Sequence, residues 1–98
     1  MRNFKIEKLL DGQEVISKEP GNSMVPLIRH RQPVKIAPAG WEDCEVGDIA
    51  YCKVHGRVFT HLVKAKDLQK GLLIGNNHGY NNGWTKTVYG KVVEVLEN

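Results

Sequence analysis

The sequence contains no apolar run close to the roughly 18–20 residues that a membrane-spanning helix requires. Its first ten residues alternate charged and apolar side chains, so they lack the apolar core of a signal peptide. The absence of both features argues against a membrane anchor and a secretory leader. We therefore expect a soluble, cytoplasmic protein with no membrane span.

Cysteine is also scarce. Cys44 and Cys52 are too few for the disulfide framework of a small secreted domain. Their spacing matches no common zinc motif, although His55 lies close by in the sequence. We expect two ordinary cysteines, at least one of them buried on a strand, and neither a metal site nor a cofactor.

The chain also lacks a large net charge of either sign. Lysine and arginine number 14 against 11 acidic residues, which gives a formal net charge of +3. Nucleic-acid binding depends on clustered charge more than on a small positive sum. The one tight basic cluster, Arg29–Arg31, is more typical of a solvated turn. Nucleic acid is therefore an unlikely partner.

Helix signals are nearly absent, because no stretch longer than about ten residues places apolar side chains at helical spacing. Short runs rich in Val, Ile, Tyr and Phe appear instead, divided by Gly, Pro and Asn. The predicted strands are Phe4–Leu10, Glu14–Ser17, Pro33–Ile36, Asp48–Val54, Arg57–Lys64, Leu72–Gly75 and Thr87–Leu96. The 98 residues predict a single domain, 1–98, of the all-β class: a mostly antiparallel curled sheet or partly open barrel with short helical turns.

Turn residues refine this prediction. Val54–Arg57 is typical of a tight hairpin, and Asp11-Gly12 is a second hairpin signal. Asn76–Trp84 carries four asparagines and two glycines, which tolerate positive φ angles. We expect that segment to be a loop and not a strand.

The most specific string in the chain is PGNSMVP, residues 20–26. Pro20 and Gly21 break the preceding strand, and Ser23 is a good residue to begin a helical turn. The string resembles the nucleophile box of type I signal peptidases and, less closely, that of the SOS repressors. An ordinary Ser cap at a strand-to-turn junction is the alternative interpretation of this string alone.

Further segments resemble the same superfamily and follow its order along the chain. VGDIA, residues 46–50, is similar to its Gly-Asp-Ile-Val strand opening, and FTHLV, residues 59–63, falls where its general base lies. LIGNN, residues 73–77, resembles the Gly-Asp-Asn-Asn segment of the branch that uses a histidine base, and YGKVV, residues 89–93, resembles the closing strand. The resemblance covers about residues 20–93.

The resemblance implies a serine peptidase with Ser23 as nucleophile and His61 as general base. A serine hydroxyl needs such a base, and an imidazole can accept a proton near neutral pH. The supporting or oxyanion residues implied are Asn22, Met24, Asn76 and Asn82. The edge strand before the nucleophile is expected to bind an extended substrate through Ile16, Lys18 and Pro20.

The chain departs from the family at the residues that orient the base. The histidine branch uses acidic residues there, whereas Asn76 and Asn82 stand at the matching positions here. An amide can orient an imidazole but does not offset the charge of an imidazolium. His78, in the same loop, is expected to face the site, and Lys64 is a weaker substitute base because strand alternation places it opposite His61.

Three functions therefore remain open at this point. The first is a serine endopeptidase that cleaves a peptide bond in a protein substrate or in itself. The second is an inactive module of the same fold that binds a peptide or protein partner. The third and weakest is a nucleic-acid or regulator-binding protein that uses Arg29, Arg31, Lys35 and exposed aromatic residues such as Trp41 or Trp84. The sequence gives no indication of the oligomeric state.

Overall fold

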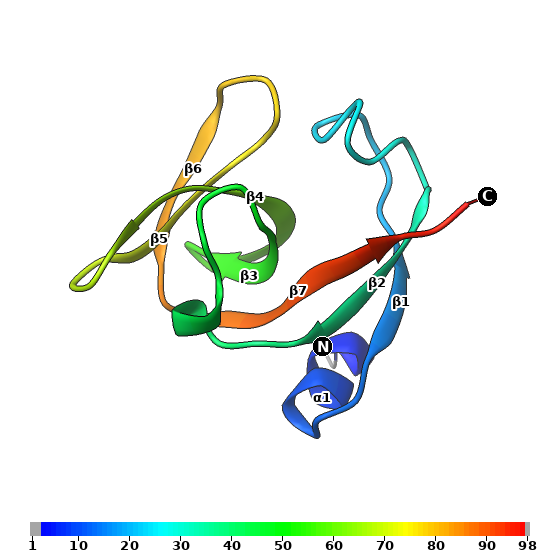
Figure 1. Ribbon diagram of the computed structural model, residues 1–98, viewed down its shortest axis with the longest axis horizontal. Helices are drawn as coiled ribbons and strands as arrows, with labels where there is room; N and C mark the ends of the chain where they lie inside the picture. Colours follow the sequence, from blue (N-terminus) through cyan, green and yellow to red (C-terminus); the bar gives the residue numbers. More distant parts are fainter. Residues whose placement is uncertain (1–2, 98) are drawn as a thin grey trace.

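Seven strands form one antiparallel sheet in the computed structural model of the chain, which describes residues 3–97 (Figure 1). The strands are β1 (Val15–Lys18), β2 (Pro33–Pro38), β3 (Ile49–Val54), β4 (Arg57–Asp67), β5 (Gly71–Gly75), β6 (Asn81–Thr85) and β7 (Val88–Val95). Their order across the sheet is β1-β2-β7-β3-β4-β5-β6, and each neighbouring pair is antiparallel. The all-β class predicted from the sequence is confirmed. Residues 1, 2 and 98 of the predicted domain lie outside the described residues.

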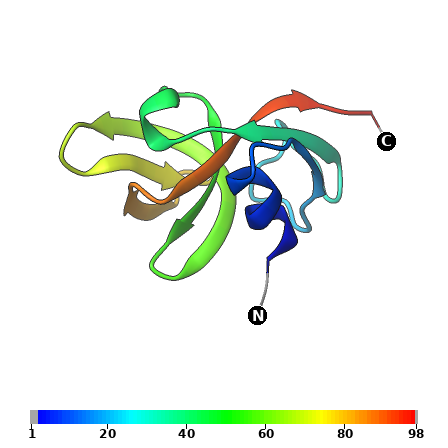
Figure 2. The same cartoon turned by 90° about the horizontal axis from the view of Figure 1, so that it is seen from below.

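The sheet is curled but not closed. β7 runs between two halves, with β1 and β2 on one side and β3 to β6 on the other (Figures 1 and 2). The end of β6 folds back toward β3, because the Thr85 hydroxyl donates to the Lys53 carbonyl (2.7 Å). The Lys53 amide in turn donates to the Thr87 carbonyl (2.9 Å). These bonds tighten one half of the sheet into a small curl.

The apolar side chains form two clusters, one for each half of the sheet. Strand alternation buries every second residue of β1, so that Val15 and Ser17 point inward while Ile16 and Lys18 are exposed. The first cluster comprises Leu9, Val15, Met24, Ile28, Val34, Ile36 and Tyr51. The second comprises Cys44, Ala50, Cys52, Val54, Val63, Leu72 and Ile74.

The predicted first strand is wrong, because Phe4–Leu10 forms the helix α1. The Asn3 side chain accepts a hydrogen bond from the Ile6 amide (3.1 Å), which caps the helix start. Leu9 is 3% exposed and packs in the first cluster. Asp11 ends the helix, so the Asp11-Gly12 turn joins a helix to β1 instead of closing a hairpin.

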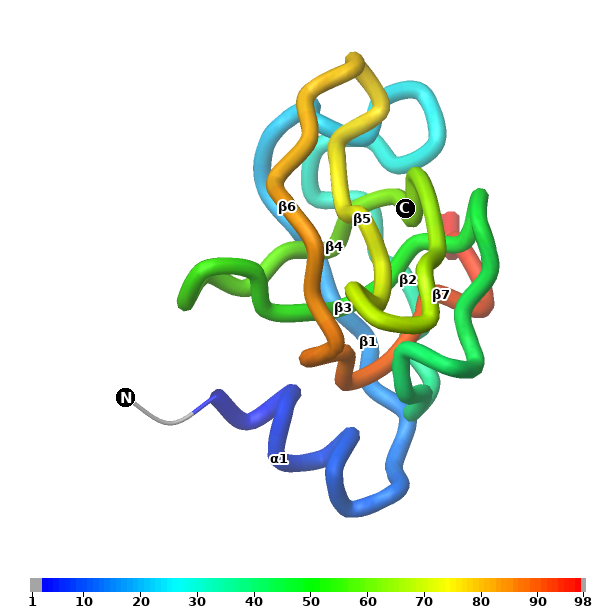
Figure 3. Tube along the Cα trace, turned by 90° about the vertical axis from the view of Figure 1, so that its left-hand side faces the viewer, coloured from blue at the N-terminus to red at the C-terminus, as the bar shows by residue number. Residues whose placement is uncertain are grey.

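In the described part of the chain, helical structure outside α1 is limited to a 3-10 turn, η1 (Trp41–Asp43). Among residues 3–97, no helix has the length and the apolar character needed to cross a membrane. The tube view in Figure 3 shows α1 at one end of the molecule, away from the loops that connect β1 to β2 and β5 to β6.

The segment Asn76–Trp84 is only partly the loop that its composition predicted. β6 begins at Asn81 and pairs with β5, with Trp84 opposite Leu73. Gly75, at the end of β5, faces the Tyr80 carbonyl and leaves no room for a Cβ, which would lie 2.5 Å from that oxygen. The loop proper is therefore residues 76–80, and cross-strand pairing outweighs the low strand propensity of Asn and Gly.

The hairpin predicted at Val54–Arg57 is confirmed. It joins β3 to β4, and both central residues have positive φ, 48° at His55 and 81° at Gly56. Two consecutive positive φ angles are typical of the turn whose twist matches that of antiparallel strands. The turn places Arg57 at the start of β4, which leads to the candidate site.

Candidate active site

Ser23 lies on a loop between β1 and β2 that is closed at its neck. The Arg31 amide donates to the Glu19 carbonyl (2.8 Å), which joins the two ends of the loop. Within it, the Ile28 amide donates to the Met24 carbonyl (2.9 Å). Met24 is 5% and Ile28 4% exposed, and both belong to the first apolar cluster. These two anchors hold the loop on the core while Ser23 remains half-exposed.

The long strand β4 carries His61 to the same place. His61 pairs with Ala50 of β3, and its ring stacks on that of Phe59 with centroids 5.0 Å apart. The Ser23 Oγ lies 3.1 Å from His61 Nε2, a hydrogen-bond distance. The chain thus brings together two side chains that are 38 residues apart in sequence.

The other side of the His61 ring is held by β6. The Asn82 side-chain oxygen Oδ1 lies 2.7 Å from His61 Nδ1. A carbonyl oxygen can only accept, so Nδ1 carries the proton and donates it to Asn82. Nε2 is then the unprotonated nitrogen, and it can accept the hydrogen bond from the Ser23 hydroxyl. This tautomer is the one that a general base toward Ser23 requires.

The loop at residues 76–80 clamps the segment that carries Ser23. The Asn77 amide donates to the Ser23 carbonyl (2.8 Å), and its side-chain Nδ2 donates to the Val25 carbonyl (3.0 Å). His78 Nε2 donates to the Asn22 carbonyl (2.9 Å). The two loops accordingly lie side by side in Figures 1 and 3. Three bonds therefore tie the nucleophile turn to the strand pair that carries Asn82.

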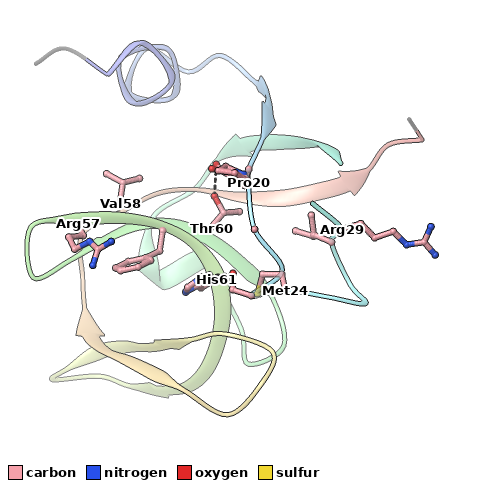
Figure 4. A pocket seen from close by; sticks show the side chains of 12 residues that line it. Pro20, Met24, Arg29, Arg57, Val58, Thr60 and His61 are labelled. Carbon is pink, nitrogen blue, oxygen red and sulfur yellow. Dashed lines mark hydrogen bonds between the residues drawn. The ribbon is translucent and has the colours of Figure 1, made fainter. Parts of the chain in front are cut away.

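A cavity of about 300 Å³ opens beside Ser23 and His61. Figure 4 shows that it lies between the nucleophile loop and the first half of β4. Its lining combines buried apolar side chains with charged ones: Glu19, Pro20, Gly21, Ser23, Met24, Ile28, Arg29, Arg57, Val58, Phe59, Thr60 and His61. The volume is large enough to hold one amino-acid side chain next to the two catalytic candidates.

One strand edge borders this cavity, and a second ends next to it at Lys18. β1 is the terminal strand of the sheet and pairs only with β2 among the described residues. β4 pairs with β3 from Arg57 onward, whereas its pairing with β5 starts at Leu62. One edge of β4 from 57 to 61 is therefore unpaired within residues 3–97. An unpaired edge is a surface to which an extended peptide can add.

The residues predicted to support Ser23 and His61 differ in whether they contact these two side chains. Met24 is buried in the cavity wall, and Asn82 contacts His61 as described above. Asn22 contributes its carbonyl, which accepts from His78 and from the Val25 amide (3.2 Å). Asn76, the other asparagine predicted to orient His61, bonds elsewhere.

The Asn76 side chain shapes its own loop. Its Oδ1 accepts from the amides of His78 (2.8 Å) and Tyr80 (3.0 Å), which fixes the turn between β5 and β6. Of the two asparagines predicted to orient His61, Asn82 contacts its ring and Asn76 does not. Asn76 therefore acts on the site only through the position of the loop.

Of the residues predicted to bind substrate, one lines the cavity and two do not. Pro20 lines the cavity, whereas Ile16 and Lys18 are exposed on β1 outside its lining. Lys64 lies on β4 at an irregularity of the pairing with β5, and its Cε packs against Gly75. Contacts of Lys64 thus give no support to a role as substitute base.

No individual role was predicted from the sequence for three residues of the site: Glu19, Thr60 and Asn77. Glu19 and Thr60 line the cavity and are joined by a side-chain hydrogen bond (2.9 Å). Only the tertiary fold brings them together, since they are 41 residues apart. Asn77 is part of the motif that carries the resemblance, so its position gave a signal that was not used.

The two cysteines take no part in the site. Both are buried and unpaired, and Cys52 lies on β3 as expected for at least one of them. Burial raises the pKa of the Cys44 thiol to about 11 and that of the Cys52 thiol to about 12. Thiols in this state are poor nucleophiles at neutral pH. Within residues 3–97, no three His, Cys, Asp or Glu side chains are grouped in a way that could hold a metal ion.

A comparison of the chain with protein-family models gives no match, and a comparison with curated proteins gives no significant one. The functional interpretation therefore depends on the geometry of Ser23, His61 and Asn82 and on the cavity beside them.

Proposed function

We propose that this protein is a serine endopeptidase of the signal-peptidase and SOS-repressor type, with Ser23 as nucleophile and His61 as general base. One observation carries the proposal: Ser23 Oγ lies 3.1 Å from His61 Nε2 while Asn82 Oδ1 holds Nδ1 at 2.7 Å. Acyl transfer to a serine needs a nucleophile, a base that is hydrogen-bonded to it, and a group that is hydrogen-bonded to the base and orients it.

The proposed reaction proceeds in two halves. His61 Nε2 takes the hydroxyl proton as Ser23 Oγ attacks the carbonyl carbon of a peptide bond. The imidazolium then gives this proton to the leaving amine, and the C–N bond breaks to leave an acyl ester on Ser23. A water molecule, deprotonated by His61, hydrolyses the ester and restores the serine.

The developing oxyanion requires donors placed near Ser23. We assign this role to the backbone N–H of Ser23, at the start of the turn that Met24 and Ile28 anchor. The Gly21 amide is already bonded to His30 Nδ1 (2.7 Å), so it is directed away from the oxyanion. The three bonds from the loop at residues 76–80 keep this turn in place.

The substrate in this proposal is an extended segment of a protein. The unpaired edge of residues 57–61 in β4 borders the cavity, and β1, whose outer edge is also unpaired among the described residues, ends next to it, so a peptide strand can bond to the backbone beside Ser23. The proposal places the protein in the cytoplasm, and the substrate is another protein or the protein itself.

A second candidate function is a module that binds a peptide without cleaving it. The observation that favours it is the amide at Asn82, which orients His61 but provides no negative charge to stabilise the imidazolium. Both functions use the same cavity and strand edges, so they differ in chemistry and not in the ligand.

Cleavage assays distinguish the two. Wild-type protein and the Ser23→Ala variant would be incubated with a panel of extended peptides between about pH 6 and 9, and the products identified by mass spectrometry. Cleavage by the wild type that is absent in Ser23→Ala supports the peptidase. Peptides that bind the folded wild type and stay intact support the binding module.

A further inference from the structure

A carboxylate is fixed in the cavity beside the dyad. Glu19 Oε1 accepts hydrogen bonds from the Thr60 hydroxyl (2.9 Å) and from the Ser17 hydroxyl (2.8 Å). Ser17 is 1% and Thr60 7% exposed, so both donors are buried. Glu19 itself is half-buried and lines the cavity. The two bonds fall on one oxygen, which leaves Oε2 to meet a ligand.

Much of the remaining wall is apolar, although Arg29 and Arg57 also line the cavity. Met24 and Ile28 are buried in it, and the Phe59 ring adds an aromatic surface next to His61. A side chain that fills this space therefore contacts hydrocarbon along most of its length and meets the carboxylate of Glu19 at one point. Lysine and arginine have this structure, because an aliphatic stem carries a cation at its tip.

The cations of the protein itself leave Glu19 open to such a partner. Lys5 donates to Ser17 (2.9 Å) and reaches the carboxylate only through that hydroxyl. Arg57 lies over the Phe59 ring, 5.6 Å from its centroid, and Figure 4 shows Arg29 extending away from the cavity. Within residues 3–97, no ion pair joins Glu19 to a basic side chain.

We propose that the cavity binds a lysine or arginine side chain of the peptide, with Glu19 as the residue that determines this specificity. The inference rests on the proposed function in one respect, namely that the bound peptide is a substrate. Binding of the basic side chain itself requires no catalysis. A charged hydrogen bond in a partly desolvated site is stronger than a neutral one, so a basic side chain is preferred over an apolar side chain of equal length.

The test uses the Ser23→Ala variant, so that no peptide is consumed. Its ¹⁵N-labelled form would be titrated with acetylated, amidated hexapeptides of Val and Ser that carry one Lys, norleucine or Glu, placed at each position in turn. We expect the best Lys peptide to bind about tenfold more tightly than its norleucine counterpart, with shifts in the amides of the nucleophile loop and of residues 57–61. The Glu peptides should bind most weakly.

The matched control is the Ser23→Ala, Glu19→Gln double variant, since Gln still accepts from Ser17 and Thr60 but carries no charge. In it the Lys and norleucine peptides should bind equally. The inference is overturned if norleucine binds as tightly as Lys in the Glu19 protein, if the preference survives Glu19→Gln, or if no peptide binds at millimolar concentration.

Failure of this inference is distinguishable from failure of the proposed function. Peptide cleavage that depends on Ser23 but shows no preference for Lys would refute the specificity alone. A Lys preference that depends on Glu19, in a protein that cleaves no peptide, would refute the peptidase and leave the binding site.

Discussion

The Asn82 side-chain oxygen lies 2.7 Å from Nδ1 of His61, on the side of the ring away from Ser23. This contact selects the tautomer in which Nε2 is free to accept the serine proton. An amide in this place orients the ring but adds no charge. The site therefore places a hydroxyl, an imidazole and an orienting amide in hydrogen-bond contact but holds no negative charge beside the imidazole.

Replacing Asn82 tests that interpretation. Asn82→Asp keeps the acceptor and adds a negative charge that stabilises the imidazolium, so we expect the rate of Ser23 acylation to rise by about tenfold or more. Asn82→Ala removes the acceptor and should lower the rate by a similar factor. The rates can be followed with a chromogenic ester. Equal rates in the three proteins, with unchanged folding, would show that Asn82 does not act on the base.

Asn77 offers a test of the clamp on the nucleophile turn. Asn77→Ala removes the donor to the Val25 carbonyl but leaves the backbone bond to Ser23, so we expect a rate lower by about five- to tenfold. Asn77→Asp should lower it further, since it places a carboxylate against that carbonyl. Thermal melts of both variants control for unfolding. A rate that is unaffected by Asn77→Asp would contradict the positioning role.

The docking of α1 gives a prediction about stability. Leu9 is 3% exposed in the first apolar cluster, whereas its neighbour Leu10 is 73% exposed. Leu9→Ala should lower the free energy of unfolding by about 2–4 kcal/mol, because it removes buried surface and leaves a cavity. Leu10→Ala, the matched control, should change it by less than about 0.5 kcal/mol. Urea denaturation measures both, and equal effects would contradict the placement of the helix.

The buried thiols predict a loss of stability in alkali. Burial raises the pKa of Cys44 to about 11 and of Cys52 to about 12 in the folded chain, from the ordinary thiol value of 9.0 that applies in the unfolded chain. The folded state therefore favours the protonated thiols, and this stabilisation is complete below the unfolded pKa. It is lost as the pH rises toward the folded values, by about 1 kcal/mol for each thiol between pH 8 and 10.

Urea denaturation at pH 8, 9 and 10 measures this loss. The Cys44→Ala, Cys52→Ala double variant is the control, and its stability should fall less steeply with pH than that of the wild type. Tyr51, whose pKa burial also raises, remains in both proteins and contributes equally. Parallel pH profiles would show that the thiols do not titrate differently in the folded chain.

Much of the fold could be predicted because alternation and turn residues act locally. The runs from Pro33 onward matched strands, and the His55-Gly56 turn followed from residues that tolerate positive φ. The helix α1 was missed because seven residues give too short a pattern, and its stability comes from the packing of Leu9. β6 was missed because its pairing with β5 is a tertiary property.

The site shows the same limit. Ser23 and His61 could be selected from motifs, and Asn82 from its place in the family segment, although their catalytic roles remain predictions. No sequence pattern pairs Glu19 with Thr60, because their bond exists only once the segment after β1 and the strand β4 lie together at the cavity. Strand edges and cavity walls are formed by the fold, so the specificity of the site could not be derived from local pattern.

The most direct test of the central claim is covalent labelling of Ser23 by a small fluorophosphonate at pH 8, read by intact mass and by peptide mapping. The account predicts one adduct, on Ser23, that is lost in Ser23→Ala and slowed by at least about a hundredfold in His61→Ala. Circular dichroism and thermal melts would show that both variants are folded. Labelling that is absent from the folded wild type, or that is as fast in His61→Ala, would contradict the dyad.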